Sequence, residues 1–500
     1  MNKTLLLPTL MASALIAPIT HAAPVLLAMG TLTQSAAGTE ADLSGLSAPM
    51  ENGVAGNLLG GIGSGLAYAG GNTFIATPDR GPNATPYKSA VDDTVSYIDR
   101  FQTIGMGLVA NPNYVPGTNQ PYLLNPTLNA TTLLWSASPL NYGDGSAYGL
   151  GSGAPALNSA DVNYFTGRSD NFSTPGLSTN PANARLDPEA VRVSNDGRSL
   201  FVSDEYGPYV YQFDRATGER IRTFAVPDNL AVSTLGPTTV AEDSPNNTTG
   251  RVANKGMEGL AITPDGKTLV GIIQAPALQD KNKYLRIVTF DIATGQATHE
   301  YAYQLTTGSG VSDLVAINDH EFLVDERDGK GLGDGSAAVI KQVFKIDITG
   351  ATDVMNEASL SNSTMTGKNA VAKSALPVVD LVALLNAAGI AGTDIPAKIE
   401  GLAFGPDLVF NATDYHTLFI ANDNDFLPTE AGPNQFYVVG IPFTDLPGYQ
   451  EQQVPVAPTL WLIGAGLLGL RRGARGSLRR DIKITKVFHA ICRSGRSSAR

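Results

Sequence analysis

Short apolar segments alternate with polar turns along most of the chain, and one such pattern recurs four times. Each copy has an acidic residue, an apolar segment, a polar turn, a second apolar segment and a further polar or acidic end. Two of the turns contain Asp-Gly pairs, at Asp196 and Asp265, which strongly favour β-hairpins. The copies therefore predict pairs of antiparallel strands. The acids that open them are spaced by 69, 55 and 87 residues, and they are Glu189, Glu258, Asp313 and Glu400.

Further apolar segments follow the first pair in three copies, so each of these copies predicts four strands. The added segments lie at residues 210–224, 286–290 and 343–346. Repeats of four strands with insertions between them are typical of β-propeller blades. With degenerate blades expected at residues 65–81 and 122–135, we predict an all-β protein, a β-propeller of about six four-stranded blades with loop insertions.

The rest of the body is expected to close and decorate this ring. The apolar segment Val25–Leu32 is placed to supply a strand to the final blade. Residues 136–186 are rich in Ser, Gly, Asn and Pro, which predicts a long exposed insertion.

Both ends of the chain are predicted to be targeting segments. Residues 1–22 combine Lys3, a short apolar run and small residues at the end, as secretory signal peptides do. The body is then expected over residues 23–453. Residues 454–475 contain prolines, an apolar glycine-rich run and an arginine pair, and they resemble the PEP-CTERM sorting signals of Gram-negative bacteria; the alternative is a buried apolar strand. Residues 476–500 form a basic tail that is expected to be disordered.

Charge is unevenly distributed between the body and the tail. Ten of the 34 basic residues and one of the 46 acidic residues lie after Leu470, and one lysine lies in the first 22 residues. The segment between carries 23 basic and 45 acidic residues, so it should repel nucleic acid and anionic membranes and attract cations. The alternative is that the acidic surface only maintains solubility. The single cysteine, Cys492, lies in the tail, so the body can contain no disulfide bond.

The repeated acids are expected at one mouth of the propeller channel, because innermost strands begin there and the next strands return there. Such a group of carboxylates requires protonation or a bound cation, and oxygen ligands suit Ca²⁺. The alternative is that each acid only holds its own turn. The predicted metal ligands are Asp79, Glu189, Asp204, Glu205, Glu258, Glu326, Glu400, Asp423 and Asp425.

Basic residues are expected at the same mouth. They are suited to bind an anionic substrate, or they only neutralise the neighbouring acids. The predicted substrate-binding residues are Arg80, Lys255, Arg327 and Lys398.

Several motifs in order resemble the phytase-like domain, the family described by an esterase-like activity of phytase. The matching motifs are Asp79-Arg-Gly-Pro-Asn, Asp204-Glu-Tyr-Gly-Pro, Gly256-Met-Glu-Gly-Leu, Asp325-Glu-Arg-Asp-Gly, Ile399-Glu-Gly-Leu-Ala-Phe and Asn422-Asp-Asn-Asp-Phe. The resemblance implies a propeller related to alkaline phytases, in which Ca²⁺ at the channel mouth binds phosphate and positions water. On this basis the predicted catalytic residues are Glu258, Glu326, Arg80 and Arg327.

The leading hypothesis is a calcium-dependent phosphoesterase, exported by the sorting machinery to the surface or exterior of a Gram-negative bacterium. Its partner would be a small phosphorylated substrate, and only the terminal segments would meet a membrane. The alternative is a non-catalytic, calcium-stabilised propeller that binds an extracellular partner. A Ser-His-Asp esterase is disfavoured, because the chain has no Gly-x-Ser-x-Gly elbow and few histidines.

Overall fold

The computed structural model describes residues 22–32, 40–82, 95–169, 178–207, 209–236, 238–242 and 245–455. The predicted signal peptide up to residue 21, and the predicted sorting segment and tail beyond residue 455, lie outside these residues. Within the described part of the chain, no helix is long and apolar enough to cross a membrane.

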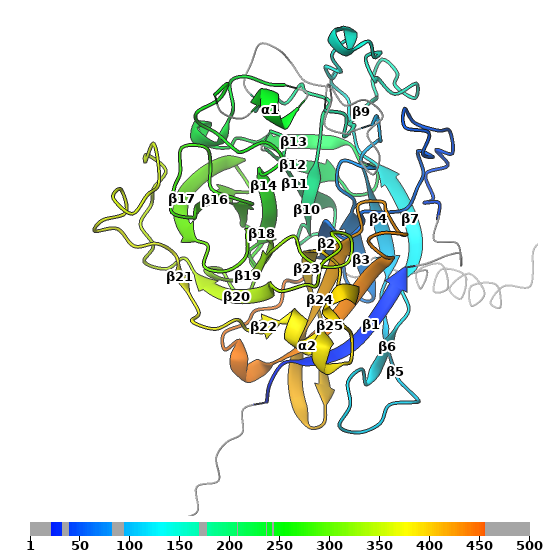
Figure 1. Ribbon diagram of the computed structural model, residues 1–500, viewed down its shortest axis with the longest axis vertical. Coiled ribbons are helices and arrows are strands. Elements are labelled where there is room, and N and C mark those ends of the chain that lie inside the picture. Colours follow the sequence, from blue (N-terminus) through cyan, green and yellow to red (C-terminus); the bar gives the residue numbers. More distant parts are fainter. Residues whose placement is uncertain are drawn as a thin grey trace, which may run out of the picture. The chain divides into compact units, whose positions relative to one another are not determined.

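Five antiparallel sheets, which we call blades 1 to 5, surround a common axis (Figure 1). The Asp-Gly turns join the first two strands of blades 2 and 3, as predicted, and Gly197 and Gly266 have φ of 72°. Blade 1 is β2 (Gly65–Tyr68), β3 (Thr73–Thr77), β4 (Arg100–Gly105) and β7 (Thr127–Leu133); blade 2 is β10 (Pro188–Val193), β11 (Ser199–Asp204), β12 (Tyr209–Asp214) and β13 (Arg220–Phe224). Blade 3 is β14 (Met257–Ile262), β15 (Thr268–Ile273), β16 (Tyr284–Asp291) and β17 (Gln296–Gln304); blade 4 is β18 (Gly310–Ala316), β19 (Glu321–Arg327), β20 (Lys341–Asp347) and β21 (Ala372–Lys373), with β22 (Val379–Asp380) also on β20. Blade 5 is β23 (Lys398–Phe410), β24 (Thr413–Asp423), β25 (Asn434–Pro442) and β1 (Val25–Leu32).

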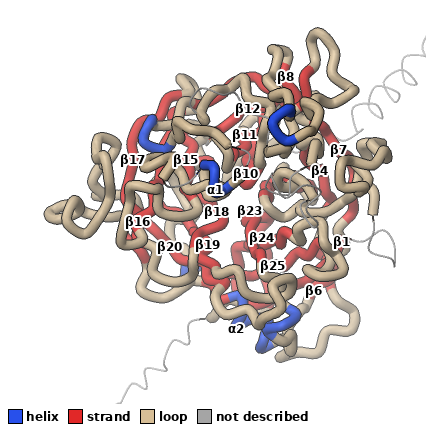
Figure 2. The backbone as a smooth tube through the Cα atoms, turned by 45° about the horizontal axis from the view of Figure 1, so that its top comes forward, coloured by secondary structure: helices blue, strands red, loops and turns tan. Residues whose placement is uncertain are grey.

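The ring closes by the route that the sequence predicts. Strand β1, from the start of the body, is the outermost strand of blade 5 and pairs with β25. The innermost strands β2, β10, β14, β18 and β23 contact one another in a closed ring. Three of them, β10, β18 and β23, are labelled near the centre of Figure 2.

The number of blades corrects the sequence prediction, because there are five and not about six. The segment at residues 122–135 does not form a blade. Strand β7 is the outer strand of blade 1, while β6 (Tyr122–Leu124) pairs with β5 (Leu108–Ala110) in a separate hairpin. A blade requires an innermost strand at the axis, and this segment contains none.

The insertion at residues 136–186 is also less exposed than expected. It contains β8 (Trp135–Ser136, at its start), β9 (Asn163–Tyr164) and the 3₁₀ turn η1 (Ser146–Tyr148). Five of its side chains join the apolar cluster between blades 1 and 2, and they are Leu140, Tyr142, Phe165, Ala184 and Leu186. The few remaining helical segments are short: η2 (Asp228–Leu230), α1 (Thr239–Glu242), α2 (Leu381–Ala387), η3 (Gly392–Asp394) and η4 (Phe443–Asp445).

The core consists of apolar clusters between adjacent blades, but an ion pair fills the axis itself. Arg192 Nη2 donates to both oxygens of Asp313, at 2.8 and 2.7 Å. The backbone N–H groups of Leu260 and Leu402 also donate to Asp313, and Arg192 Nη1 donates to the carbonyl of Leu66. One buried pair therefore connects strands of all five blades and divides the channel.

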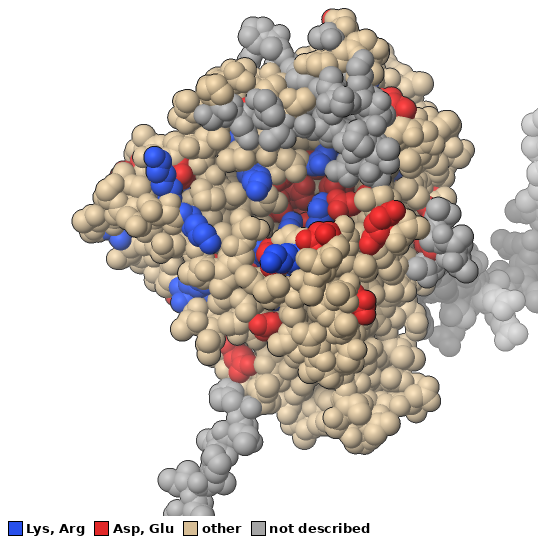
Figure 3. All heavy atoms as spheres, in the orientation of Figure 1, with Lys and Arg blue, Asp and Glu red and all other residues tan. Residues whose placement is uncertain are grey.

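The inner strands all begin at one end of the channel. The last described segment of the chain covers the opposite end. Gln450 donates its backbone N–H to Ile317, and Gln452 Nε2 donates to the carbonyl of Val193. A cavity of only about 50 Å³ lies between this segment and Arg192. The hollow where the inner strands begin, which we call the mouth, is therefore the open end of the channel (Figure 3).

Candidate functional site

A β-bulge brings side chains into the mouth at the same place in several blades. In blades 2, 4 and 5 two residues of the inner strand face one residue of the next strand, and in blade 3 the register shifts at Glu258. Such bulges re-aim side chains and are frequent beside functional sites. The residue at this position is Glu189, Glu258, Ser312 and Glu400 in blades 2 to 5.

Two of these glutamates are each followed by a glycine, Gly259 and Gly401. Glycine is required at both positions because the inner strands approach each other closely at the axis. A Cβ atom on Gly259 would lie 3.0 Å from the Cα of Asp313, and one on Gly401 would lie 2.9 Å from the carbonyl oxygen of Gly63. The Glu-Gly-Leu motif thus combines a side chain for the mouth with a backbone that fits a crowded channel.

A second set of residues enters the mouth from the ends of the second strands. In each blade, one residue of the second strand pairs with a Leu or Val of the inner strand. The residue that enters the mouth lies three positions after that paired residue in the sequence. These residues, in blade order, are Asp79, Glu205, Gln274, Arg327 and Asp423.

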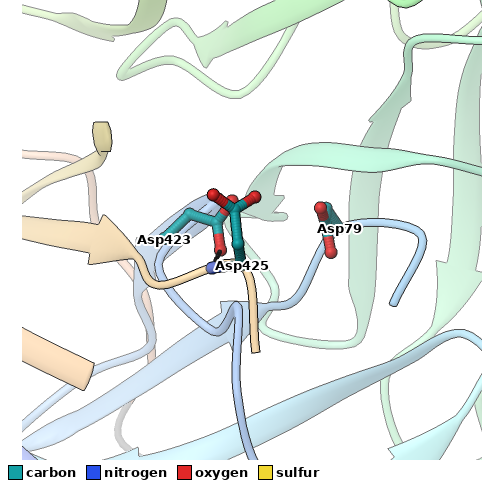
Figure 4. Close-up of side chains that lie close together, drawn as sticks. All are labelled: Asp79, Asp423 and Asp425. Carbon is teal, nitrogen blue, oxygen red and sulfur yellow. Dashed lines mark hydrogen bonds between the residues drawn. The ribbon is translucent and has the colours of Figure 1, made fainter. Parts of the chain in front are cut away.

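The first acidic cluster consists of Asp79, Asp423 and Asp425, whose carboxylate oxygens lie within 4.8 Å of one another. Asp423 is the last residue of β24 in blade 5 and Asp425 follows it, and Asp79 faces them from the loop after β3 of blade 1 (Figure 4). Asp425 has φ of 50° and donates its backbone N–H to Asp423. Lys398 Nζ lies 2.7 Å from Asp423 Oδ2 and 2.5 Å from Asp425 Oδ1, so this cluster already has a cation partner.

The second acidic cluster consists of Asp187, Glu189 and Glu205, all buried in blade 2, with oxygens that also lie within 4.8 Å of one another. Arg80 donates to Asp187 through its backbone N–H at 2.9 Å and through Nη1 at 3.1 Å. Among the described residues, no lysine or arginine forms an ion pair with Glu189 or Glu205, although the charge of Arg80 lowers the pKa of Glu205 from a longer distance.

A third group links blades 3, 4 and 5. Arg327 donates through Nη2 to Glu400 and through Nε to Ser312, and its Nη2 lies 3.6 Å from Glu258. Gln274 Nε2 donates to Glu258 Oε1 at 2.8 Å. Arg327 is therefore the central cation of this side of the mouth.

The mouth favours protonated carboxyl groups. Burial and the carboxylate of Glu258 raise the pKa values of Glu189 and Glu205 well above the usual range, and burial and Asp423 do the same for Asp79. Burial and Glu400 raise the pKa of Glu258 to about 7. Asp425 differs, because burial raises its pKa but the contact with Lys398 and the charges of Arg80 and Arg327 together lower it further.

Two atoms in this region need either a shared proton or a bound cation. Glu205 Oε1 and Glu258 Oε2 are buried and have no hydrogen-bond partner, although buried polar atoms are normally paired. Both belong to carboxyl groups that face each other from blades 2 and 3, and these groups hydrogen-bond to each other when one of them is protonated. A hard cation with oxygen ligands matches this donor set.

Three acids that the sequence analysis expects at the mouth do not line it, and they are Glu326, Asp204 and Asp313. The reason is that the predicted alignment of the repeated strands is off by one residue. Glu326 is equivalent to Asp204 and points away from the mouth, accepting hydrogen bonds from Tyr303, Thr307 and Lys373. The oxygens of Asp204 accept backbone N–H groups of Asp187, Tyr206 and Gly207. Asp313 lies at the axis with Arg192, and Ser312 holds the position expected for it.

The structure brings together the remaining predicted residues at or near the mouth. Lys255 is exposed in the turn before β14, beside Asn254, which accepts from Arg80. Asp187, Gln274 and Ser312 were not among the predicted site residues. In the sequence, these residues can be recognised only by their positions in the repeated unit. The bulge hides those positions, because it shifts the alternation of side chains by one residue.

The family follows from comparison with known proteins. A model of the Phytase-like family, described as "Esterase-like activity of phytase", matches residues 57–426. The chain belongs to this family. The matched range contains both acidic clusters, and the resemblance deduced from the motifs is confirmed.

The individual proteins that resemble this chain share only a small part of its sequence. An uncharacterized secreted protein of the fungus Arthroderma benhamiae is 31% identical over 291 residues, which cover 50% of this chain and 53% of that protein. The match thus spans about half the length of the fungal protein. Among solved structures, hydrazine synthase of Kuenenia stuttgartiensis has a TM-score of 0.31 at 14% identity, covering 74% of this chain and 79% of the other. A gluconolactonase from Xanthomonas campestris has a TM-score of 0.30 at 10% identity, covering 84% and 98%.

Proposed function

We propose that this chain is an exported phosphoesterase that binds calcium at the mouth and acts on a small phosphorylated molecule. Family membership supports a phytase-like hydrolase. The fungal relative is described as secreted, which supports export and agrees with the signal peptide predicted at residues 1–22. The surface or exterior of a Gram-negative cell as the destination is proposed from residues 454–475 alone.

The observation that carries the proposal is the pair of unpartnered, buried oxygens, Glu205 Oε1 and Glu258 Oε2, in a mouth lined by further carboxylates. Charges in such a place require a counter-ion or protonation. Glu189, Glu205 and Glu258, with Asp187 beside them, would hold the ion. A bound Ca²⁺ supplies charge neutralisation for a phosphate and lowers the pKa of a coordinated water.

The residues of the chain itself would orient the substrate and move the proton. Arg80 and Arg327 flank the glutamates from two sides, at distances set by their ion pairs with Asp187 and Glu400, and each is suited to steady phosphate oxygens. The carboxyl of Glu258, with a pKa of about 7, is poised to accept a proton from water near neutral pH.

The test is hydrolysis of phytate, an aryl phosphate and an aryl ester by the purified protein, each with Ca²⁺ and with a chelator. Phosphate release that requires Ca²⁺ is the expected result. Ester cleavage that is indifferent to the chelator would contradict a metal-dependent phosphoesterase.

The second candidate is a calcium-stabilised binding propeller without turnover. It is favoured by the ion pairs of the mouth, since Arg80, Arg327 and Lys398 all contact carboxylates already. In that case no substrate would be hydrolysed, while Ca²⁺ would still raise the melting temperature.

A further inference from the structure

The two acidic clusters of the mouth use the same positions of the repeated unit, but they differ in charge at one of them. In blade 2, Asp187 stands two residues before the bulge position, and its carbonyl accepts the backbone N–H of Glu205 at 3.1 Å. In blade 5, Lys398 stands two residues before the bulge position and pairs with Asp423 across the strands. Blades 3 and 4 have glycine there. A lysine in blade 5 therefore takes the place of an aspartate in blade 2.

The Lys398 ammonium contacts two of the three carboxylates in the first acidic cluster. Its Nζ donates to Asp423 Oδ2 at 2.7 Å and to Asp425 Oδ1 at 2.5 Å. The charges of Glu400 and Asp79 also act on Lys398. One ammonium thus interacts with four carboxylates from blades 1 and 5, and it supplies positive charge to this half of the mouth.

A metal ion in the first cluster would need the same oxygens as Lys398. The carboxylate oxygens of Asp79, Asp423 and Asp425 lie within 4.8 Å of one another. This is roughly twice the calcium–oxygen distance of about 2.3–2.6 Å, so the three acids could share one ion. Such an ion would lie beside the ammonium, and two cations at contact distance repel each other strongly. Lys398 and a metal ion therefore exclude each other.

The second cluster has no such side chain. Its three acids, Asp187, Glu189 and Glu205, also lie with oxygens within 4.8 Å of one another. Arg80 forms an ion pair with Asp187. Among the described residues, no lysine or arginine does so with Glu189 or Glu205. Buried carboxylates without a cation need a proton or a bound ion, so the second cluster has a requirement that Lys398 already meets in the first.

We propose that the Lys398 ammonium takes the place of a metal ion in the first acidic cluster, and that calcium enters the mouth only at the second. This inference deepens the proposed function, and it rests on that function for the ion held by Glu189 and Glu205. Lys398 then sets the number and the position of bound ions. A tethered ammonium neutralises its half of the mouth at any calcium concentration.

The test is calorimetric titration of the full chain with CaCl₂, comparing the wild type with Lys398→Met, which removes the charge and keeps an unbranched side chain. The variant is expected to bind one ion more than the wild type and to show a larger calcium-induced rise in melting temperature. In excess chelator at pH 8 it should melt below the wild type, because its carboxylates have lost their cation. Lys398→Asp reproduces the pattern of blade 2 and should gain the same ion with higher affinity. Lys267→Met, at an exposed turn, is the matched control and should change neither quantity.

An unchanged number of bound ions in both Lys398 variants would overturn the proposal. Calcium binding by Lys398→Met but not by the wild type would contradict the proposed function and still support this role of Lys398. If neither variant folds, crystals of wild-type protein grown with CaCl₂ decide the matter. An anomalous-scattering peak among Asp79, Asp423 and Asp425 overturns the proposal, whereas calcium in the second cluster alone, with Lys398 still on Asp423, supports it.

Discussion

At the residue scale, the mouth illustrates how neighbouring carboxyl groups acquire different properties. Glu258 and Asp423 both have pKa values raised to about 7, while Asp425, two residues from Asp423, has a lowered pKa because Lys398 contacts it directly. Glu258 has a buried oxygen without a partner, and Asp425 does not. The two groups are therefore suited to different tasks, Glu258 to proton transfer or ion binding and Asp425 to fixing a lysine.

Glu258→Gln should reduce calcium-dependent phosphate release by at least about 100-fold, because it removes both a ligand charge and a proton acceptor. The measurement is kcat on the best phosphoester substrate at saturating calcium. Glu430→Gln, at an exposed position, is the control. Unchanged turnover in Glu258→Gln on every phosphoester would show that this residue has no part in catalysis.

Breaking the axial ion pair should be among the most damaging single changes. Arg192→Met leaves Asp313 buried and unpaired at the point where all five blades meet, which we expect to cost about 3–5 kcal/mol of unfolding free energy. Urea unfolding measures this cost, and Arg198→Met on an exposed turn is the control. The double change Arg192→Met with Asp313→Leu should be milder than the sum, and simple additivity would contradict the pairing.

At the element scale, the repeated bulge at the start of the inner strands is the feature that forms the site. It turns Glu189, Glu258 and Glu400 into the mouth and displaces Asp313 to the axis. The following residue must be small where inner strands approach closely. Site and channel packing thus depend on the same few backbone positions.

Gly401→Ala should destabilise the protein by about 1–3 kcal/mol, because its Cβ would meet the Gly63 carbonyl at 2.9 Å. The same change should lower activity by displacing Glu400. Thermal unfolding and turnover provide the two readouts. Gly329→Ala is a close control, since nothing lies within 4 Å of the added atom, and it should be neutral.

At the scale of the whole molecule, blades 1, 2, 3 and 5 direct carboxylates to one open mouth, to which blade 4 contributes Arg327, and the axial pair and the last described segment close the other end of the channel. The carboxylates of the mouth therefore repel one another in the folded state. A bound cation or protons relieve that repulsion, so pH and calcium should act on the stability of the molecule together.

The stability of the calcium-free protein should fall as pH rises from about 5 to 8. Burial raises the pKa values of Glu258 and Asp423 to about 7, above their usual 4.5 and 3.8, so the folded state holds more protons than the unfolded state in this window. Each pH increase then favours unfolding. The lowered pKa of Asp425 acts only below its usual 3.8 and does not offset this.

Calcium should reverse the trend, giving a larger rise in melting temperature at pH 8 than at pH 5, because ions compete with protons for the same oxygens. Melting curves at both pH values, with calcium and with chelator, measure the difference. A calcium-induced shift that is equal at both pH values would contradict shared sites.

The sequence alone determined the strand pairs, the Asp-Gly hairpins, the closing of the ring by β1 and the presence of acids at strand ends, because these depend on local alternation and turn chemistry. It did not determine the number of blades, since Thr127–Leu133 has the pattern of any strand and only its pairing with β4 makes it the edge of blade 1. The bulge escaped prediction for a similar reason. It shifts side chains by one position without changing the pattern of residue types, so Glu326 and Asp313 were expected in the mouth. Only the packing of five inner strands around one axis decided that Asp313 pairs with Arg192.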